Sequence, residues 1–138
     1  MTASINAFVP KPHTPFQWEP MEAVDALSVK KNFLRDNVKS RMIEMDFNSF
    51  HMGYLEAVFT RGDRRLSAVI YEAWKRGARF DGWKEHFNLN LWLESFKDRG
   101  LNPDFYAARR RDADEILPWS FIDIGFSIPL YVDNSVSV

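Results

Sequence analysis

Two runs of arginine are the residues whose type and spacing most readily suggest chemistry. The first reads Arg61-Gly62-Asp63-Arg64-Arg65 and lies where two predicted helices meet. Guanidinium groups beside a helix N-terminus, with its free amides, can hold a phosphate group. The alternative is that the glycine ends one helix, the aspartate caps the next, and the arginines are solvated. The sequence leaves both interpretations open.

The second run, Arg109-Arg110-Arg111, has aromatic neighbours at Tyr106 and Trp119. Cations interleaved with aromatic rings can contact an RNA backbone and its bases. Acidic residues follow this run directly and largely cancel its charge, namely Asp112, Asp114 and Glu115. A surface turn held by salt bridges is therefore the alternative to an RNA contact.

An aromatic stretch, Phe80 to Phe87, contains the polar candidates Asp81, Trp83 and His86. It can form a stacking platform, or a turn that joins the core, with Gly82 allowing close backbone approach. Metal binding has less support, because the three histidines, His13, His51 and His86, fall in different predicted elements and form no His-Glu-x-x-His unit. We therefore predict no metal site.

Composition limits the classes of protein to which this chain can belong. Of its 138 residues 46% are hydrophobic, which is enough for one compact core and not for two. A net charge of -1 gives no global field for a polyanion. No cysteine is present, so the chain cannot ligate an iron-sulfur cluster through thiolates. With no long apolar run and no secretory signal, we expect no membrane span and a cytoplasmic location.

The first third of the chain predicts a strand, a helix and a second strand. Residues 3–9 roughly alternate small or polar side chains with apolar ones, which indicates a strand. Four prolines then stiffen the loop over 10–20. A helix is expected from Pro20 to about Ser40, followed by a strand at Ile43 to Phe47. Two strands joined by a helix in this way pair in parallel with a right-handed crossover.

From Asn48 onward the periodicity is helical. One helix is expected after a cap at Asn48 or Ser49, with Gly62 as a left-handed stop, and another between Asp63 and Gly77. A third is expected between Asn88 and Gly100, then a short helix after Asn102-Pro103. Phe121 to Ile124 indicate a last strand, and residues 126–138 indicate an apolar tail that is either β-prone or poorly ordered.

The proline loop is also where a family resemblance is found. Asn6 to Trp18 resembles the end of the radical S-adenosylmethionine core in a family of uncharacterised proteins with an N-terminal cobalamin-binding-type domain. More distantly it is similar to the Pro-x-Pro-x-Thr-Pro loop of methylthiotransferase-like radical enzymes. Three later stretches match in the same order: Val58 to Leu66, Phe80 to Phe87, and Leu117 to Gly125.

The resemblance implies a partial (β/α) barrel whose last strand is Ser4 to Val9. Phe8, Val9 and Pro10 would then lie at the rim, near the nucleoside of S-adenosylmethionine. The chemistry of the family requires a 4Fe-4S cluster, and the absence of cysteine means that another part of the protein would hold it. The implied partners are the rest of the radical core and the cobalamin-binding-type domain. The candidates for substrate or interdomain contacts are Arg61, Asp63, Arg64, Arg65, Asp81, Trp83 and His86.

Together these observations predict an α+β, helix-rich fold: a terminal barrel piece over 1–47, a small helical accessory domain over 48–125, and the tail. The expected function is that of the C-terminal part of a radical S-adenosylmethionine enzyme, inactive by itself. Two alternatives remain open. One is a small RNA-binding module that uses the two arginine runs, and the other is a structural segment whose aromatic face covers a partner.

Overall fold

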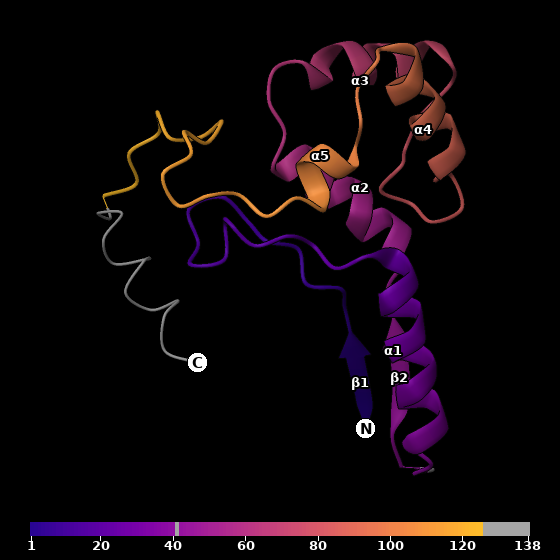
Figure 1. Cartoon of the computed structure of the whole chain (residues 1–138). Helices are drawn as coiled ribbons and strands as arrows, with labels where there is room; N and C mark the ends of the chain where they lie inside the picture. The colour runs from indigo at the N-terminus through magenta and orange to yellow at the C-terminus, as the bar shows by residue number, and fades with distance from the viewer. Residues whose placement is uncertain (41, 126–138) are drawn as a thin grey trace.

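The computed structural model describes residues 1–40 and 42–125, and it confirms an α+β, helix-rich fold with a small parallel sheet (Figure 1). The predicted tail over 126–138 lies outside the described residues. Along the chain the elements are β1 (Thr2–Ile5), α1 (Val24–Asn37), β2 (Glu44–Phe47), α2 (Phe50–Thr60), α3 (Leu66–Lys75), α4 (Leu89–Asp98) and α5 (Asp104–Ala107).

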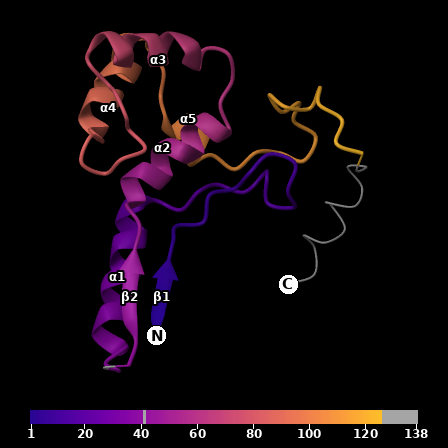
Figure 2. The same cartoon turned by 180° about the vertical axis from the view of Figure 1, so that it is seen from behind.

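The expected strand-helix-strand unit is confirmed, because β1 and β2 pair in parallel with Ala3 opposite Met45 and Ile5 opposite Phe47. One face of this sheet is half-buried and lies toward α1, whose Lys31 and Arg35 stand over the Phe47 ring. The other face is exposed, and β1 and β2 are the whole sheet among the described residues. Figures 1 and 2 show this unit projecting from the group of helices α2 to α5.

Both strands and α1 are shorter than predicted. Pro20 is not the first residue of α1, which begins at Val24. The intervening Met21 is buried in the core, and its amide donates to the carbonyl of Ala107 at 2.9 Å. This tertiary contact holds the backbone extended where the proline alone favoured a helix. No described residue of α1 is buried, so the helix depends on few packing contacts.

The helical part follows its caps and apolar spacing closely. The Ser49 side chain accepts from the amide of Met52, and the Asn88 side chain accepts from the amide of Leu91, as expected for N-caps. Apolar faces of α2, α3, α4 and α5 meet in one core, which includes Val58, Val69, Phe96 and Tyr106. The core thus lies between helices, and the sheet stands at its edge.

Gly62 lies just after the end of α2, and its role there differs from the predicted one. Its φ is not positive, so it is not a left-handed stop. A Cβ at this position would lie 2.1 Å from Leu66 Cδ1 and 2.9 Å from the Val58 carbonyl oxygen. Glycine is required here because α2 and α3 approach each other closely at their junction.

The predicted last strand at Phe121 to Ile124 is wrong. These residues form turns and open chain, and Phe121 is 85% exposed. No other strand lies beside them in the described part of the chain, so their β propensity has no partner to satisfy. The segment from Arg109 to Ile124 instead runs beside the proline loop, as both views show (Figure 2). No helix in the described residues is long and apolar enough to cross a membrane.

Candidate functional site

A cleft opens at the carboxyl ends of the two parallel strands. It has a volume of about 720 Å³ and is bordered by the chain after β1, the chain after β2, the first turns of α2 and part of the loop over 80–87. Phe47 ends β2, and Ser49 caps α2 two residues later. Ile5, the last residue of β1, pairs with Phe47, so both strands end beside the N-terminus of α2. The fold therefore brings three segments that are distant in sequence, within 6–11, 46–56 and 82–84, to one hollow.

Most polar side chains in the cleft already have partners. Asn48 donates to the amide oxygen of Asn6, and Lys11 forms an ion pair with Glu56. Ser49 is occupied by capping α2. Within residues 1–40 and 42–125, the two lining charges without an ion pair or hydrogen bond are the carboxylate of Asp46 and the ammonium of Lys84.

The three residues expected at the rim divide between the cleft and the interior. Phe8 and Val9 line the cleft, and Phe8 is 59% exposed with its ring edge-on to Phe16 at 5.2 Å. Pro10 does not line it and is fully buried. Phe8 and Val9 are thus placed to touch a molecule in the cleft, whereas Pro10 fixes the direction of the chain.

The loop over 80–87 is mostly exposed, and it joins the core only at its last residue, Phe87, which is half-buried against it. Trp83 is 64% exposed, and His86 contacts the Phe80 ring at a centroid distance of 6.0 Å. A Cβ added at Gly82 would meet no atom within 4 Å, so the close backbone approach considered for this glycine is not found. Asp81 is half-buried in a shallower hollow beside Phe59 and Phe87. The loop reaches the cleft through its neighbours Gly82 and Lys84.

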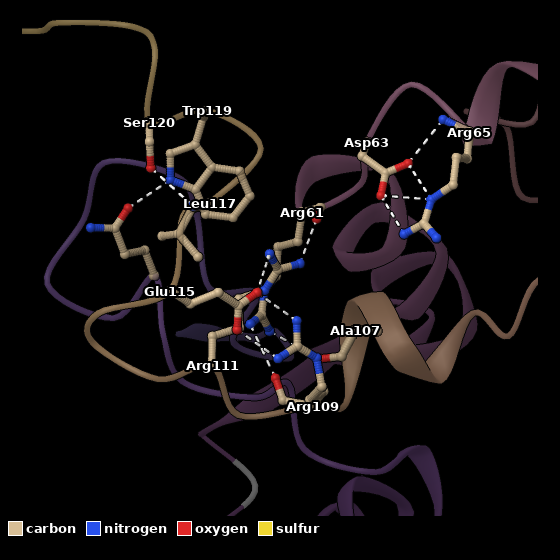
Figure 3. Close-up of polar contacts among 11 residues, drawn as sticks. Arg61, Asp63, Arg65, Ala107, Arg109, Arg111, Glu115, Leu117, Trp119 and Ser120 are labelled. Carbon is tan, nitrogen blue, oxygen red and sulfur yellow. Dashed lines mark hydrogen bonds and ion pairs between the residues drawn. The ribbon is translucent and has the colours of Figure 1, made fainter.

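The two arginine runs are brought together in the fold (Figure 3). Arg61 is fully buried, and its guanidinium donates to the carbonyls of Ala107 at 3.0 Å and Arg109 at 3.3 Å. Burial, aided by repulsion from Arg111 and Arg109, lowers the pKa of Arg61 to about 10. Arg61 is still charged at neutral pH and joins the end of α2 to the segment after α5.

Glu115 supplies the negative charge in this cluster. Both of its oxygens accept from Arg109 at 2.7 Å, and Arg111 lies 3.8 Å away. These contacts hold the pKa of Glu115 below its usual range. Arg111 is itself buried beneath the Trp119 ring at 5.1 Å. The expected salt-bridged turn is present, but its centre lies inside the protein.

The remaining members of the first run differ in exposure. Arg65 forms an ion pair with Asp63 at 2.6 Å and stands over the rings of Phe105 and Tyr106. This pairing lowers the pKa of Asp63. Arg64 is exposed, and no ion pair joins it to a described residue. Of the five residues, Arg64 has the side chain most available to an RNA or another partner.

A polar link fixes the proline loop to the C-terminal segment. Trp119 Nε1 donates to Gln17 Oε1 at 2.7 Å, and the same oxygen accepts from the amide of His13 at 3.1 Å. The amide of Arg111 donates to the carbonyl of Trp18 at 2.9 Å. The loop after β1 is therefore held by contacts among residues that do not line the cleft.

The sequence indicated Glu115 as a salt-bridge partner of the second arginine run, but it did not single out Asp46, Lys84 or Gln17 as site or cluster residues. Asp46 alternates with apolar residues in a predicted strand, which places its side chain on the opposite face, and that was an available signal. Lys84 lies within the aromatic stretch from Phe80 to Phe87. The partnership of Gln17 with Trp119 spans 102 positions, and no local pattern indicates it.

The donor groups of the described residues do not fit an iron-sulfur cluster. The sequence has no cysteine, and no three His, Asp or Glu side chains of the described residues gather as a metal site. The cleft is lined by polar side chains and by the aromatic residues Phe8 and Phe47.

Comparison with known proteins gives one distant relative. The chain is 27% identical over 99 residues to an uncharacterized protein of Methanocaldococcus jannaschii, MJ0966. The match covers 71% of this chain and 22% of the relative, so the chain spans about a fifth of that protein's length. No family model matches, and no solved structure matches.

Proposed function

We propose that this chain is the C-terminal part of a radical S-adenosylmethionine enzyme of unknown substrate. It supplies late strands of the barrel and a helical accessory domain, and it is not catalytic alone because its residues cannot ligate the cluster. One observation carries the proposal: an isolated pair of parallel strands with a cleft at its carboxyl end. Active sites of (β/α) barrels lie at that end, and parallel sheets are ordinarily covered on both faces.

The free edge of β1 supports this proposal. The carbonyl of Met1 accepts from the amide of Glu44 at 3.0 Å, so the backbone of Met1, Ala3 and Ile5 is directed toward β2. Backbone groups alternate in direction along a strand, so those of Thr2 and Ser4 are directed to the opposite edge. A preceding parallel strand can pair there and continue the sheet. In this proposal β2, which pairs with β1, would extend the barrel by one strand beyond the strand that the resemblance treats as the last.

In the complete enzyme, Phe8 and Val9 would contact the nucleoside of S-adenosylmethionine. The exposed residues Arg64, Trp83 and His86 would face the substrate or the cobalamin-binding-type domain, together with Asp81. Four other candidates would not contact a ligand and would instead fix the segments that border the cleft: Pro10, Arg61, Asp63 and Arg65. The match covers 22% of the relative from Methanocaldococcus jannaschii. The rest of that protein is long enough to contain a cluster-binding core, and we propose that it does.

The test compares two proteins after anaerobic reconstitution with iron and sulfide. The proposal predicts that the full-length relative acquires a 4Fe-4S cluster and, once reduced, converts S-adenosylmethionine into 5′-deoxyadenosine. It predicts that the isolated chain acquires no stoichiometric cluster and forms no 5′-deoxyadenosine. A relative without a cluster, or an isolated chain that cleaves S-adenosylmethionine, would overturn it.

A further inference from the structure

The outer face of α3 carries two aromatic side chains that the core does not use. Tyr71 is 58% exposed and Trp74 is 52% exposed, and their rings stack with centroids 5.8 Å apart and an interplanar angle of 19°. Other residues of the same helix, Val69 and Ala73, are the ones buried in the core. Figures 1 and 2 show α3 on the side of the helical group away from the sheet. The ring pair is therefore open to a partner from outside.

A cation lies over each ring of this pair. Lys75 Nζ is 5.7 Å from the ring centroid of Tyr71, and Arg79 Cζ is 4.9 Å from that of Trp74. Arg79 Nη1 donates to the carbonyls of Trp74 at 2.7 Å and Ala78 at 2.6 Å, which fixes the guanidinium group at the end of the helix. Arg79 Nε and Nη2 have no acceptor among the described residues. Two neighbouring N–H groups thus remain for an external anion.

The charge of this face is positive. Arg64, in the turn that leads into α3, is exposed, and neither it nor Arg79 forms an ion pair with a described residue. Lys75 lies 3.7 Å from Glu72, but Glu72 also accepts from Arg99 at 2.6 Å. The carboxylates of α4 that lie near α3 are paired with one arginine: Glu94 and Asp98 with Arg76. The cations around the ring pair therefore exceed the carboxylates available to them.

The two arginine runs that suggested an RNA contact contribute little to such a surface. Arg61 and Arg111 are buried. Three further members pair with carboxylates: Arg65, Arg109 and Arg110. Among the described residues, Arg64 is the member of the runs whose side chain has no partner. A contact with nucleic acid would therefore centre on α3 and include only this arginine from the runs.

We infer that the outer face of α3 binds single-stranded nucleic acid. Bases stack against the Tyr71–Trp74 pair and the guanidinium group of Arg79, and phosphates are held by Arg64, Lys75 and Arg79. Aromatic rings beside cations suit unpaired bases, because each base can stack on a ring while its phosphate meets a neighbouring charge. The inference is independent of the proposed function, since none of these residues lines the cleft.

The test measures binding of fluorescein-labelled probes of about twelve nucleotides to the full chain by fluorescence anisotropy. The probes are single-stranded RNA and DNA of one mixed sequence and the corresponding RNA duplex, with inorganic polyphosphate as a competitor that has no bases. We expect the single strands to bind at about 50 mM salt and to lose about 15-fold in affinity at about 200 mM, since three phosphate contacts give a slope of about −2. The duplex should bind about tenfold more weakly, because its bases cannot stack on the protein.

Variants separate stacking from charge. Trp74→Ala and Tyr71→Ala are each expected to lower the affinity for single strands about tenfold and to leave the salt slope unchanged. Arg79→Gln is expected to reduce the salt slope by about 0.7. Matched changes at exposed residues of other segments, Phe33→Ala on α1 and Arg110→Gln in the second arginine run, are expected to have no effect. Circular dichroism checks that each variant is folded.

The outcomes decide between a nucleic-acid surface and other roles of this face. Weaker binding by the ring variants but not by Phe33→Ala supports the inference, and a preference for RNA or DNA then identifies the natural ligand. Unchanged affinity in Trp74→Ala, or competition by polyphosphate as strong as that by RNA, overturns it because charge alone would then act. A loss in Arg110→Gln equal to that in Arg79→Gln also overturns it. Absence of binding at about 50 mM salt overturns it as well and leaves the ring pair as a contact for a protein.

Discussion

Arg111 Nη2 donates to the backbone carbonyl of Arg61 at 2.7 Å, which joins the two arginine runs of the sequence inside the fold. Arg61 in turn donates to the carbonyls of Ala107 and Arg109. Each run thus satisfies backbone groups of the other. The end of α2, α5 and the segment that supports the proline loop are fastened together by this exchange (Figure 3).

Replacing Arg61 should therefore unfold the protein more readily. Arg61→Ala leaves two carbonyls without their donor and creates a cavity, and we expect a loss of about 3 kcal/mol in the free energy of unfolding. Arg61→Met keeps most of the stem and should lose less. The exposed Arg64→Ala serves as control and should change stability by less than about 0.5 kcal/mol. Chemical denaturation measures all three, and equal effects at positions 61 and 64 would contradict this account.

Glu115 should make stability depend on acid pH. Its pKa is lowered in the folded protein by Arg109, and an unfolded glutamate titrates near about 4.3. A lowered folded pKa means that the stabilisation is complete above about pH 5 and is lost as pH falls through the folded value. Glu115→Gln should lower stability at pH 7 by about 1 kcal/mol.

The difference between wild type and Glu115→Gln should shrink as the pH falls from about 5 toward about 3. Denaturation midpoints at a series of pH values give this difference. Glu94, a more exposed residue whose bond is to Arg76 just after α3, offers a control through Glu94→Gln. A difference at position 115 that stays constant with pH would show that the carboxylate is not the titrating group.

Gly53 and Gly62 should respond in opposite directions to alanine. Gly53→Ala should raise the free energy of unfolding by about 0.5 to 1 kcal/mol, because the added methyl group makes only ordinary contacts within a helix. Gly62→Ala should lower it by more than about 1 kcal/mol, because Leu66 and the Val58 carbonyl occupy the space.

Thermal unfolding of the two glycine variants measures both changes, and a gain in stability at position 53 would show that the fold does not need glycine there. A loss of stability at position 53 would mean that glycine is needed by the fold after all.

Trp119→Phe should loosen the C-terminal segment without disturbing the helical core. The change removes the hydrogen bond to Gln17 while keeping an aromatic ring over Arg111. We expect a cost of about 1 kcal/mol. Hydrogen exchange should quicken at the amide of Arg111, which donates to the Trp18 carbonyl of the loop, and at the amide of His13, which donates to Gln17 Oε1, and stay unchanged in α3 and α4. Uniform acceleration throughout the chain would contradict a local role.

The local elements could be predicted where the chain itself carries the signal. Caps at Ser49 and Asn88 and the apolar spacing of α3 each act within a few residues, so they are readable from the sequence. The parallel pairing of β1 and β2 could be predicted because a helix connects the two strands. The helix start at Pro20 and the strand at Phe121 to Ile124 were predicted wrongly, because tertiary contacts, or their absence, override local propensity.

The candidate site was harder to predict because its parts come from three separate segments. The motif over 80–87 stands out in the sequence by its aromatic residues, yet it borders the cleft through Gly82 and Lys84. Arg61 looked like a surface cation, and it is buried because the carbonyls of Ala107 and Arg109, 46 and 48 residues away, receive it. No local rule of spacing indicates such a partner.

The most direct test of the central claim, that this chain completes a radical core without holding its cluster, uses the Methanocaldococcus jannaschii relative with and without the region similar to this chain. Electron paramagnetic resonance of the reduced cluster and 5′-deoxyadenosine formation are measured together. The account predicts that the shortened protein keeps the cluster signal and loses cleavage of S-adenosylmethionine. Cleavage by the shortened protein at the full-length rate would contradict it.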